Sequence, residues 1–191
     1  MEPDDFALMR QLQEGEDEAL EKLMDRYKEA IFGFAFRQTF DASAAADVTQ
    51  ETFVRVYLNR LKFRPTGSFR SWLYRIASNL CVDRARRARR APTANVIEPI
   101  EREGGGSILE TLEAAGPSPA DAAAREGEIA DLKAEIALLP AALREPLVLF
   151  ALEERSQQEC AEILGVSAKA VEAKVARAKA VLRDRLAKLW L

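Results

Sequence analysis

The 191-residue sequence contains no histidine, only two cysteines and no apolar run long enough to cross a membrane. Without histidine there is no imidazole general base, no Ser-His-Asp or Cys-His nucleophile system and no histidine-containing metal site. Two cysteines cannot build a four-cysteine zinc site or a disulfide framework, and they are typical of a reducing compartment. The glycine run at 104–106 follows no predicted strand, which argues against a phosphate-binding loop. We therefore expect no enzyme, no metal, no cofactor and no small-molecule substrate.

The N-terminal residues and the overall composition indicate the cellular compartment of the protein. A membrane helix needs about 20 consecutive apolar residues, so no membrane insertion is expected. The first residues, MEPDDF, are acidic and lack the basic start of a secretory signal. Apolar residues make up 48% of the chain, which is enough for a packed core. We expect a soluble cytoplasmic protein.

Charge is segregated along the chain, although the net charge is only −3. Residues 60–90 carry ten basic side chains and one acidic, and residues 165–191 carry seven basic and two acidic. The remaining stretches are acidic: 1–59 has six basic and 13 acidic side chains, and 91–164 has five and 15. Two basic segments on an acidic chain indicate two contacts with a polyanion, although two solvated helix faces would give the same pattern.

Helical periodicity dominates the first 90 residues, whereas strand signals are weak. Apolar residues recur at three- and four-residue spacing in four stretches, which begin at Phe6, Leu20, Val48 and Phe69. Asp41 or Ser43 is predicted to begin the third helix, and Ser68 is predicted to cap the fourth. We therefore expect a bundle of four helices.

The composition changes after residue 90. Residues 91–120 are acidic, contain few large apolar side chains and hold five of the glycines and prolines in two short clusters, 104–106 and 116–117. This composition predicts a flexible linker. The next helix is predicted to begin with Ser118 as its cap and Pro119 as its first residue, and to end at Leu139-Pro140. Pro146 predicts a kink or a late start in the following helix. The predicted organisation is an all-α protein with two small helical domains, 1–91 and 121–191, joined by the acidic linker 92–120.

Residues 155–186 have the pattern of a helix-turn-helix. Ser156 to Glu159 form a capping box, and Gly165 is suited to close the short helix that follows. Ser167 can cap a longer helix that carries an apolar stripe and basic side chains off that stripe. The second helix of such a unit can enter the major groove of DNA, although an ordinary helical hairpin has similar features. Cys81 and Cys160 fall on apolar faces and are expected to be packed as small hydrophobic residues.

Both halves together resemble a bacterial sigma factor of the extracytoplasmic-function type over nearly the whole chain. Residues 47–53 (DVTQETF) resemble the D-x-x-Q-E-x-F helix of conserved region two, and residues 69–79 (FRSWLYRIASN) resemble its F-x-x-W-L-x-x-I-A-x-N signature. Residues 15–23 (GEDEALEKL) are similar to the early G-D-x-x-A-x-x-x-L pattern of the family. Residues 139–144 and 158–167 resemble conserved region four.

The resemblance implies an all-α fold with a region 2 bundle and a region 4 helix-turn-helix, and it implies a function. Such a protein binds core RNA polymerase and directs it to selected promoters, under the control of an anti-sigma factor. The residues that match the polymerase contact are Asp47, Gln50, Glu51 and Phe53. Those that supply cations, an aromatic wall and a polar group for the minus-ten element are Lys62, Arg64, Trp72, Asn79, Arg84, Arg86, Arg87 and Arg90. Trp72 fits a core position at least as well.

The resemblance also implies a minus-thirty-five contact in the last long helix. The matching residues are Ser167, Lys169, Ala170, Glu172, Lys174 and Arg177. Two of them depart from the family pattern, because Ala170 stands where the family usually has Thr and so lacks a hydroxyl group, and Glu172 stands where the family usually has Lys or Arg. Glu172 cannot bind phosphate, but it can accept a hydrogen bond from a cytosine amino group, which predicts an unusual promoter or weaker binding.

Two alternatives belong to other classes of protein. A conventional helix-turn-helix transcription regulator would account for residues 155–186, but not for the basic segment 60–90 or the helix at 47–53. A sigma-like decoy that binds an anti-sigma factor without DNA is favoured slightly by Glu172 and disfavoured by the charge of 60–90. Transcription starts mapped with core polymerase separate these possibilities.

Overall fold

The computed structural model describes residues 3–64, 67–90 and 119–189, and the regular structure of these residues is helical throughout. The predicted all-α fold is confirmed. The predicted linker lies almost wholly outside the described residues, as does the predicted cap at Ser118.

The first half of the chain is a bundle of the four predicted helices. They are α1 (Asp5–Glu14), α2 (Glu18–Thr39), α3 (Ala42–Leu58) and α4 (Phe69–Arg90), with a short 3-10 turn, η1 (Arg60–Lys62), after α3. Asp41 caps α3, because its carboxylate accepts a hydrogen bond from the backbone N–H of Ala44 at 3.0 Å. Ser68 caps α4 in the same way through the N–H of Ser71, as predicted.

The second half begins with α5 (Pro119–Ala137), followed by α6 (Ala141–Leu147), η2 (Val148–Leu152), α7 (Gln157–Leu164) and α8 (Ala168–Leu189). The predicted capping box is present, since the Ser156 hydroxyl accepts from the Glu159 N–H while the Glu159 carboxylate accepts from the Ser156 N–H. Gly165 ends α7 with a φ of 65°, and Ser167 caps α8. The predicted helix-turn-helix is therefore formed by α7 and α8.

For the helix that contains Pro146, the sequence predicted either a kink or a late start. A late start is wrong, because α6 begins at Ala141 and Pro146 lies inside it. The irregularity occurs after the proline, where the α-helical turn gives way to the π-helical turn η2. The N–H that Pro146 lacks would have reached back to Ala142, four residues earlier, so the proline alone does not account for the π-helical turn that follows it.

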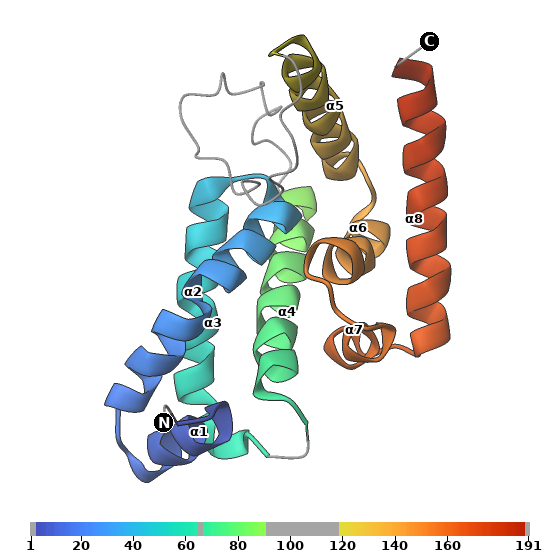
Figure 1. Cartoon of the computed structure of the whole chain (residues 1–191). Helices are drawn as coiled ribbons and strands as arrows, with labels where there is room; N and C mark the ends of the chain where they lie inside the picture. The colour runs from blue at the N-terminus through green and yellow to red at the C-terminus, as the bar shows by residue number, and fades with distance from the viewer. Residues whose placement is uncertain (1–2, 65–66, 91–118, 190–191) are drawn as a thin grey trace.

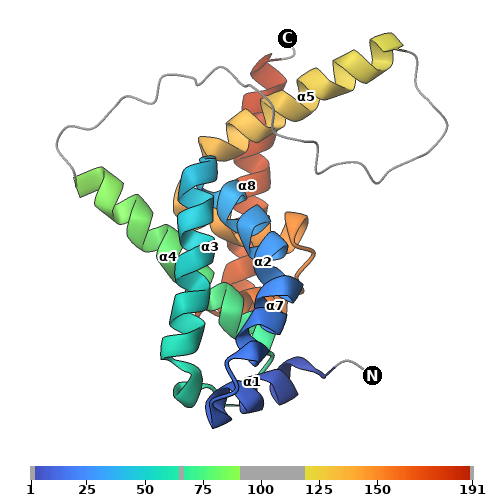
Figure 2. The ribbon, with the colours of Figure 1, turned by 90° about the vertical axis from the view of Figure 1, so that its left-hand side faces the viewer.

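The two halves pack against each other through α4. Figure 1 shows α4 in the middle of the molecule, with α2 and α3 on one side and α6 and α7 on the other. The buried residues of both halves form one continuous hydrophobic cluster. The turned view shows α1 and α5 at opposite ends of the molecule (Figure 2). Among the described residues, no helix is long and apolar enough to cross a membrane.

Candidate nucleic-acid and polymerase interfaces

The candidate polymerase residues lie on α3, and they divide between its surface and the core. Asp47, Gln50 and Glu51 are exposed, whereas Phe53 is only 2% exposed. Phe53 therefore packs α3 onto the bundle and does not offer its ring to a partner. The structure places it in a supporting position that the sequence motif does not distinguish from a contact position.

Exposed apolar side chains lie next to the exposed polar residues of α3, further along the same helix and in η1. Val54, Leu58 and Leu61 are 43%, 68% and 63% exposed. Asp47, Glu51, Val54 and Leu58 follow one another at three- and four-residue spacing, so they share one face of the helix. We call this face, together with Leu61 of η1, the α3 stripe. Its apolar part was not predicted from the sequence, although Val54 and Leu58 fall off the buried face of α3.

An ion pair connects the α3 stripe to the basic helix α4. The Arg84 guanidinium donates to the Asp47 carboxylate at 3.1 Å, and both side chains remain accessible to solvent. Exposed pairs of this kind contribute little to stability, about 0 to 1 kcal/mol. The pair therefore leaves both groups free to exchange partners when a third molecule binds.

The candidate minus-ten residues surround one side of α4. Lys62 and Arg64 are exposed in the segment before the helix, and Asn79, Arg84, Arg86 and Arg87 are exposed on it. Trp72 is half-buried, with its ring 5.1 Å from that of Phe63 and 6.0 Å from that of Phe69. It thus combines contacts to the core with partial exposure to solvent. The side chain of Arg90 lies outside the described residues.

The exposed and the packed faces of α4 point in different directions. With 100° of rotation per residue, Trp72, Asn79 and Arg86 follow at intervals of seven and share one face. Tyr74, Ser78 and Cys81 lie on another face, which packs against the second half and the bundle. The closed arrangement of the two halves therefore does not cover the face with Trp72 and Asn79.

The last long helix presents most of its candidate residues to solvent. Ser167, Lys169, Glu172 and Arg177 are exposed, and Ala170 and Lys174 are half-buried. The opposite face, formed by Val171, Val175, Ala178 and Leu182, is buried, as its periodicity predicts. The helix can therefore approach a groove with its N-terminal turns.

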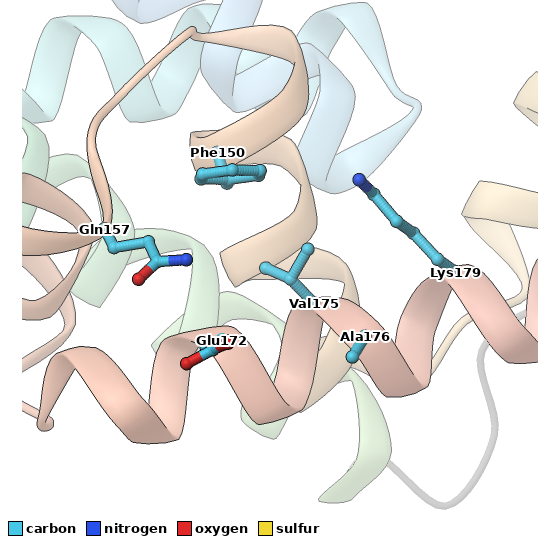
Figure 3. A pocket seen from close by; sticks show the side chains of 6 residues that line it. All are labelled: Phe150, Gln157, Glu172, Val175, Ala176 and Lys179. Atoms are coloured by element: carbon cyan, nitrogen blue, oxygen red, sulfur yellow. The ribbon is translucent and has the colours of Figure 1, made fainter.

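Glu172 lies beside a shallow apolar pocket between η2 and α8. The pocket has a volume of about 210 Å³ and is lined by Phe150, Gln157, Glu172, Val175, Ala176 and Lys179, as Figure 3 shows. The ammonium group of Lys179 lies 5.6 Å from the centre of the Phe150 ring. On the helical wheel Glu172 and Lys174 lie on opposite flanks of α8. A ligand that contacts Glu172 therefore approaches α8 from a different side than a ligand that contacts Lys174.

Two glutamates of the second half form hydrogen bonds with residues of the first half. These contacts were not predicted from the sequence. Glu153 accepts hydrogen bonds from Arg37 and from the Tyr74 hydroxyl group, and Glu145 accepts one from the Ser78 hydroxyl group. Burial, together with the nearby Glu153 carboxylate, raises the pKa of Tyr74 to about 12. Burial also raises the pKa of Glu145, even though the Ser78 hydrogen bond lowers it. No local signal marks these residues, because their partners are distant in sequence.

Both cysteines are free and buried, as expected from their apolar faces. Burial raises the pKa of Cys81 to about 12 and that of Cys160 to about 11. Such thiols are protonated at neutral pH and react slowly. Within the described residues, no cluster of His, Cys, Asp or Glu is arranged to hold a metal ion.

Comparison with known proteins identifies both halves. Residues 23–91 match the family Sigma-70 region 2, and residues 129–182 match Sigma-70, region 4. The chain is 30% identical to the ECF RNA polymerase sigma factor SigW of Bacillus subtilis over 93% of its own length and 94% of the relative. It is 33% identical to the RNA polymerase sigma factor CnrH of Cupriavidus metallidurans, and 95% of each chain is covered.

A solved structure shares the arrangement of the whole chain. The structure of CnrH in complex with the cytosolic domain of CnrY matches with a TM-score of 0.68 and 28% identity. The match covers 96% of this chain and 97% of CnrH.

Proposed function

Because this chain belongs to the ECF family of RNA polymerase sigma factors, we propose that each of its exposed surfaces has a separate task in promoter-specific transcription initiation. A sigma factor binds core RNA polymerase and promoter DNA, and it has no catalytic activity of its own. The observation that carries the proposal is the separation of three surfaces: the α3 stripe, the exposed face of α4 and the N-terminal turns of α8. The proposed organisation is a promoter-melting domain, 1–91, and a helix-turn-helix domain, 121–191, joined by the linker 92–120.

The α3 stripe is the proposed polymerase contact. Its polar end carries Asp47 and Glu51, with the exposed Gln50 beside them, and its apolar end carries Val54, Leu58 and Leu61. A mixed stripe along one helix is suited to pack against a helical partner that presents basic groups at one end and apolar groups at the other. Phe53 supports this surface from within the core.

The exposed face of α4 is the proposed minus-ten contact. Single-stranded DNA is bound by cations that follow the backbone and by aromatic rings on which bases stack. Lys62, Arg64, Arg84, Arg86 and Arg87 supply the cations, together with Arg90. The partly exposed Trp72 supplies the ring, and Asn79 on the same face of α4 supplies a polar group that can read a base edge.

The N-terminal turns of α8 form the proposed minus-thirty-five contact. The phosphate contacts are assigned to Ser167, Lys169, Lys174 and Arg177, and Ala170 contributes apolar contact. Glu172, on the flank beside Gln157, is assigned to a cytosine amino group or to exclusion of the wrong base.

We assign the protein to the cytoplasm, where core polymerase is found, and we assign to it a protein partner that controls its availability. The sigma factor CnrH, which matches this chain over 96% of its length, was solved with a second protein bound. An anti-sigma factor that occupies the α3 stripe would exclude polymerase from the same surface.

Mapping of transcription starts on genomic DNA with core polymerase and the purified protein tests the proposed function. We expect starts at a small set of sites that share two upstream sequence elements, and a loss of these starts with Asp47→Lys and Glu51→Lys together. A folded protein that co-elutes with core polymerase but yields no specific starts would be a decoy. A protein that binds DNA specifically without core polymerase would be a conventional regulator.

A further inference from the structure

Glu153 lies at the centre of the contact between the two halves. Its side chain is only 7% exposed, although it is charged and lies in the turn between η2 and α7. The guanidinium of Arg37 in α2 donates to one carboxylate oxygen through two nitrogens, one of them, Nε, at 3.1 Å. The hydroxyl group of Tyr74 in α4 donates to the other oxygen at 2.9 Å. A single carboxylate from the second half thus holds two helices of the first half.

The neighbouring residues keep this carboxylate in place. Glu154 has a positive φ of 52°, so the chain turns sharply between Glu153 and Arg155. The Arg155 guanidinium consequently lies 5.0 Å from the centre of the Tyr74 ring. Tyr74 is held at its hydroxyl by Glu153 and over its ring by Arg155.

Further polar contacts follow along α4. Glu145 of α6 accepts a hydrogen bond from Ser78, and the Arg75 side chain donates to the backbone carbonyl of Glu162 in α7. All of these contacts join residues more than 60 positions apart in sequence. They are therefore made only when the second half is closed onto α4, and they are lost when the halves separate.

The closed arrangement conflicts with the use of both DNA surfaces at once. Elements centred at minus ten and minus thirty-five are separated by about 25 base pairs, or about 85 Å of B-form DNA. A duplex of this length is too stiff to fold back, because the persistence length of DNA is about 150 base pairs. In the closed protein, α7 of the helix-turn-helix packs directly on α4. The 28 residues from 91 to 118 can span about 90 to 100 Å when extended, so the chain permits the halves to separate that far.

We propose that Glu153 is an intramolecular latch that holds this sigma factor in a closed form unable to engage both promoter elements. The α3 stripe is exposed in the closed form as well, so the latch acts where core polymerase holds both halves at the spacing of the two promoter elements. That complex requires the open form, and its formation has to break the contacts of Glu153 with Arg37 and Tyr74. The apparent affinity for core polymerase is reduced by the fraction of molecules that are open. This inference rests on the proposed function, and it adds a regulatory state to it.

The first test is carried out on the full chain with Glu153→Ala. The matched control is Glu154→Gln, which changes the adjacent exposed carboxylate of the same turn. X-ray scattering of the free proteins is expected to show a larger radius of gyration for Glu153→Ala only. Titration with core polymerase is expected to show at least about tenfold tighter binding of Glu153→Ala than of the wild type or the control.

A charge exchange keeps the inference testable if Glu153→Ala does not fold. Arg37→Glu and Glu153→Arg are each expected to open the protein, and the double variant is expected to close it again. Tyr74→Phe removes only the hydroxyl donor and is expected to open the protein less. Recovery of the compact form in the double variant shows that the pair acts as a latch and is not merely required for folding.

The outcomes separate the latch from the function on which it rests. Unchanged radius and unchanged polymerase affinity in every variant would overturn the latch. Expansion without any gain in polymerase affinity would overturn its inhibitory role. If neither the wild type nor any variant binds core polymerase, the proposed function fails, whereas the scattering result still decides whether Glu153 holds the closed form.

Discussion

At the scale of single residues, the turn that carries Glu153 depends on an unusual backbone conformation at Glu154. A positive φ is costly for a residue with a side chain, by about 1 to 2 kcal/mol, because Cβ approaches the following carbonyl oxygen. Glu154 is exposed and has a φ of 52°, so its side chain adds this cost without a buried contact. Glycine would avoid the clash, although it has more freedom to lose on folding.

We predict that Glu154→Gly stabilises the protein by roughly 0.5 to 1 kcal/mol in urea unfolding. Glu29→Gly is the matched control, because Glu29 is exposed in the middle of α2, where glycine is expected to destabilise by about 1 kcal/mol. Equal destabilisation by both changes would contradict the backbone argument.

Glu153 and Glu154 also show where prediction from the sequence ends at this scale. They are adjacent and identical in type, yet the side chain of Glu153 is only 7% exposed, whereas Glu154 is exposed. The difference comes from Arg37, which lies 116 positions away, and no local pattern can reveal such a partner. For Trp72 the prediction was partly correct. Its position in the helix favoured packing in the core, and the structure shows packing against Phe63 together with partial exposure.

At the scale of the elements, the short helix α7 depends on its cap. It has eight residues, which is too short to be stable alone, and the Ser156–Glu159 box satisfies two backbone N–H groups at its start. We predict that Ser156→Ala lowers the free energy of unfolding by about 1 kcal/mol. Ser43→Ala, an exposed position near the start of α3 that does not cap it, is the control and is expected to have little effect.

The same box makes the stability of α7 depend on pH. The N–H of Ser156, followed by its hydroxyl group, lowers the pKa of Glu159 in the folded protein. The stabilising contribution is therefore complete above the ordinary glutamate pKa of about 4.3, and it is lost as the pH falls through the lower folded value. We predict that the difference in stability between wild type and Glu159→Gln shrinks on acidification. A difference that stays constant from neutral pH into the acid range would contradict this assignment.

For α4, the testable quantity is the number of phosphate contacts. We predict that Arg84→Ala with Arg87→Ala weakens DNA binding by the polymerase complex and reduces the slope of log affinity against log salt by about two. Arg10→Ala with Lys22→Ala removes two exposed cations from α1 and α2 and is expected to leave the slope unchanged. An unchanged slope in the α4 variant would argue against phosphate contact by these arginines.

Most elements follow from local rules, which is why the sequence predicts them. The caps at Asp41, Ser68, Ser156 and Ser167 lie within a few residues of the groups that they bond. The π-helical turn after Pro146 does not follow from such a rule, because proline removes a hydrogen bond without dictating how the chain compensates. The apolar end of the α3 stripe was likewise not predicted, since exposed and buried apolar residues look alike in a motif.

At the scale of the whole molecule, the segregated charge predicts two separate DNA surfaces, and the structure connects the helices that carry them, α4 and α8, through α7, which packs on both. Composition cannot predict this closure, because it depends on the contacts of α4 with α7 and α6, and of α2 with η2, between residues that are distant in sequence. The central claim is that one chain, closed when free, separates its halves to hold two promoter elements.

The most direct test is the distance between the halves, measured by single-molecule energy transfer between dyes at Ala30→Cys in α2 and Ala180→Cys in α8. Both positions are exposed, whereas the native Cys81 and Cys160 are buried, so labelling is selective. We expect high transfer in the free protein and loss of transfer on binding to core polymerase and promoter DNA. The same high transfer in the free protein and in an active promoter complex would contradict the account.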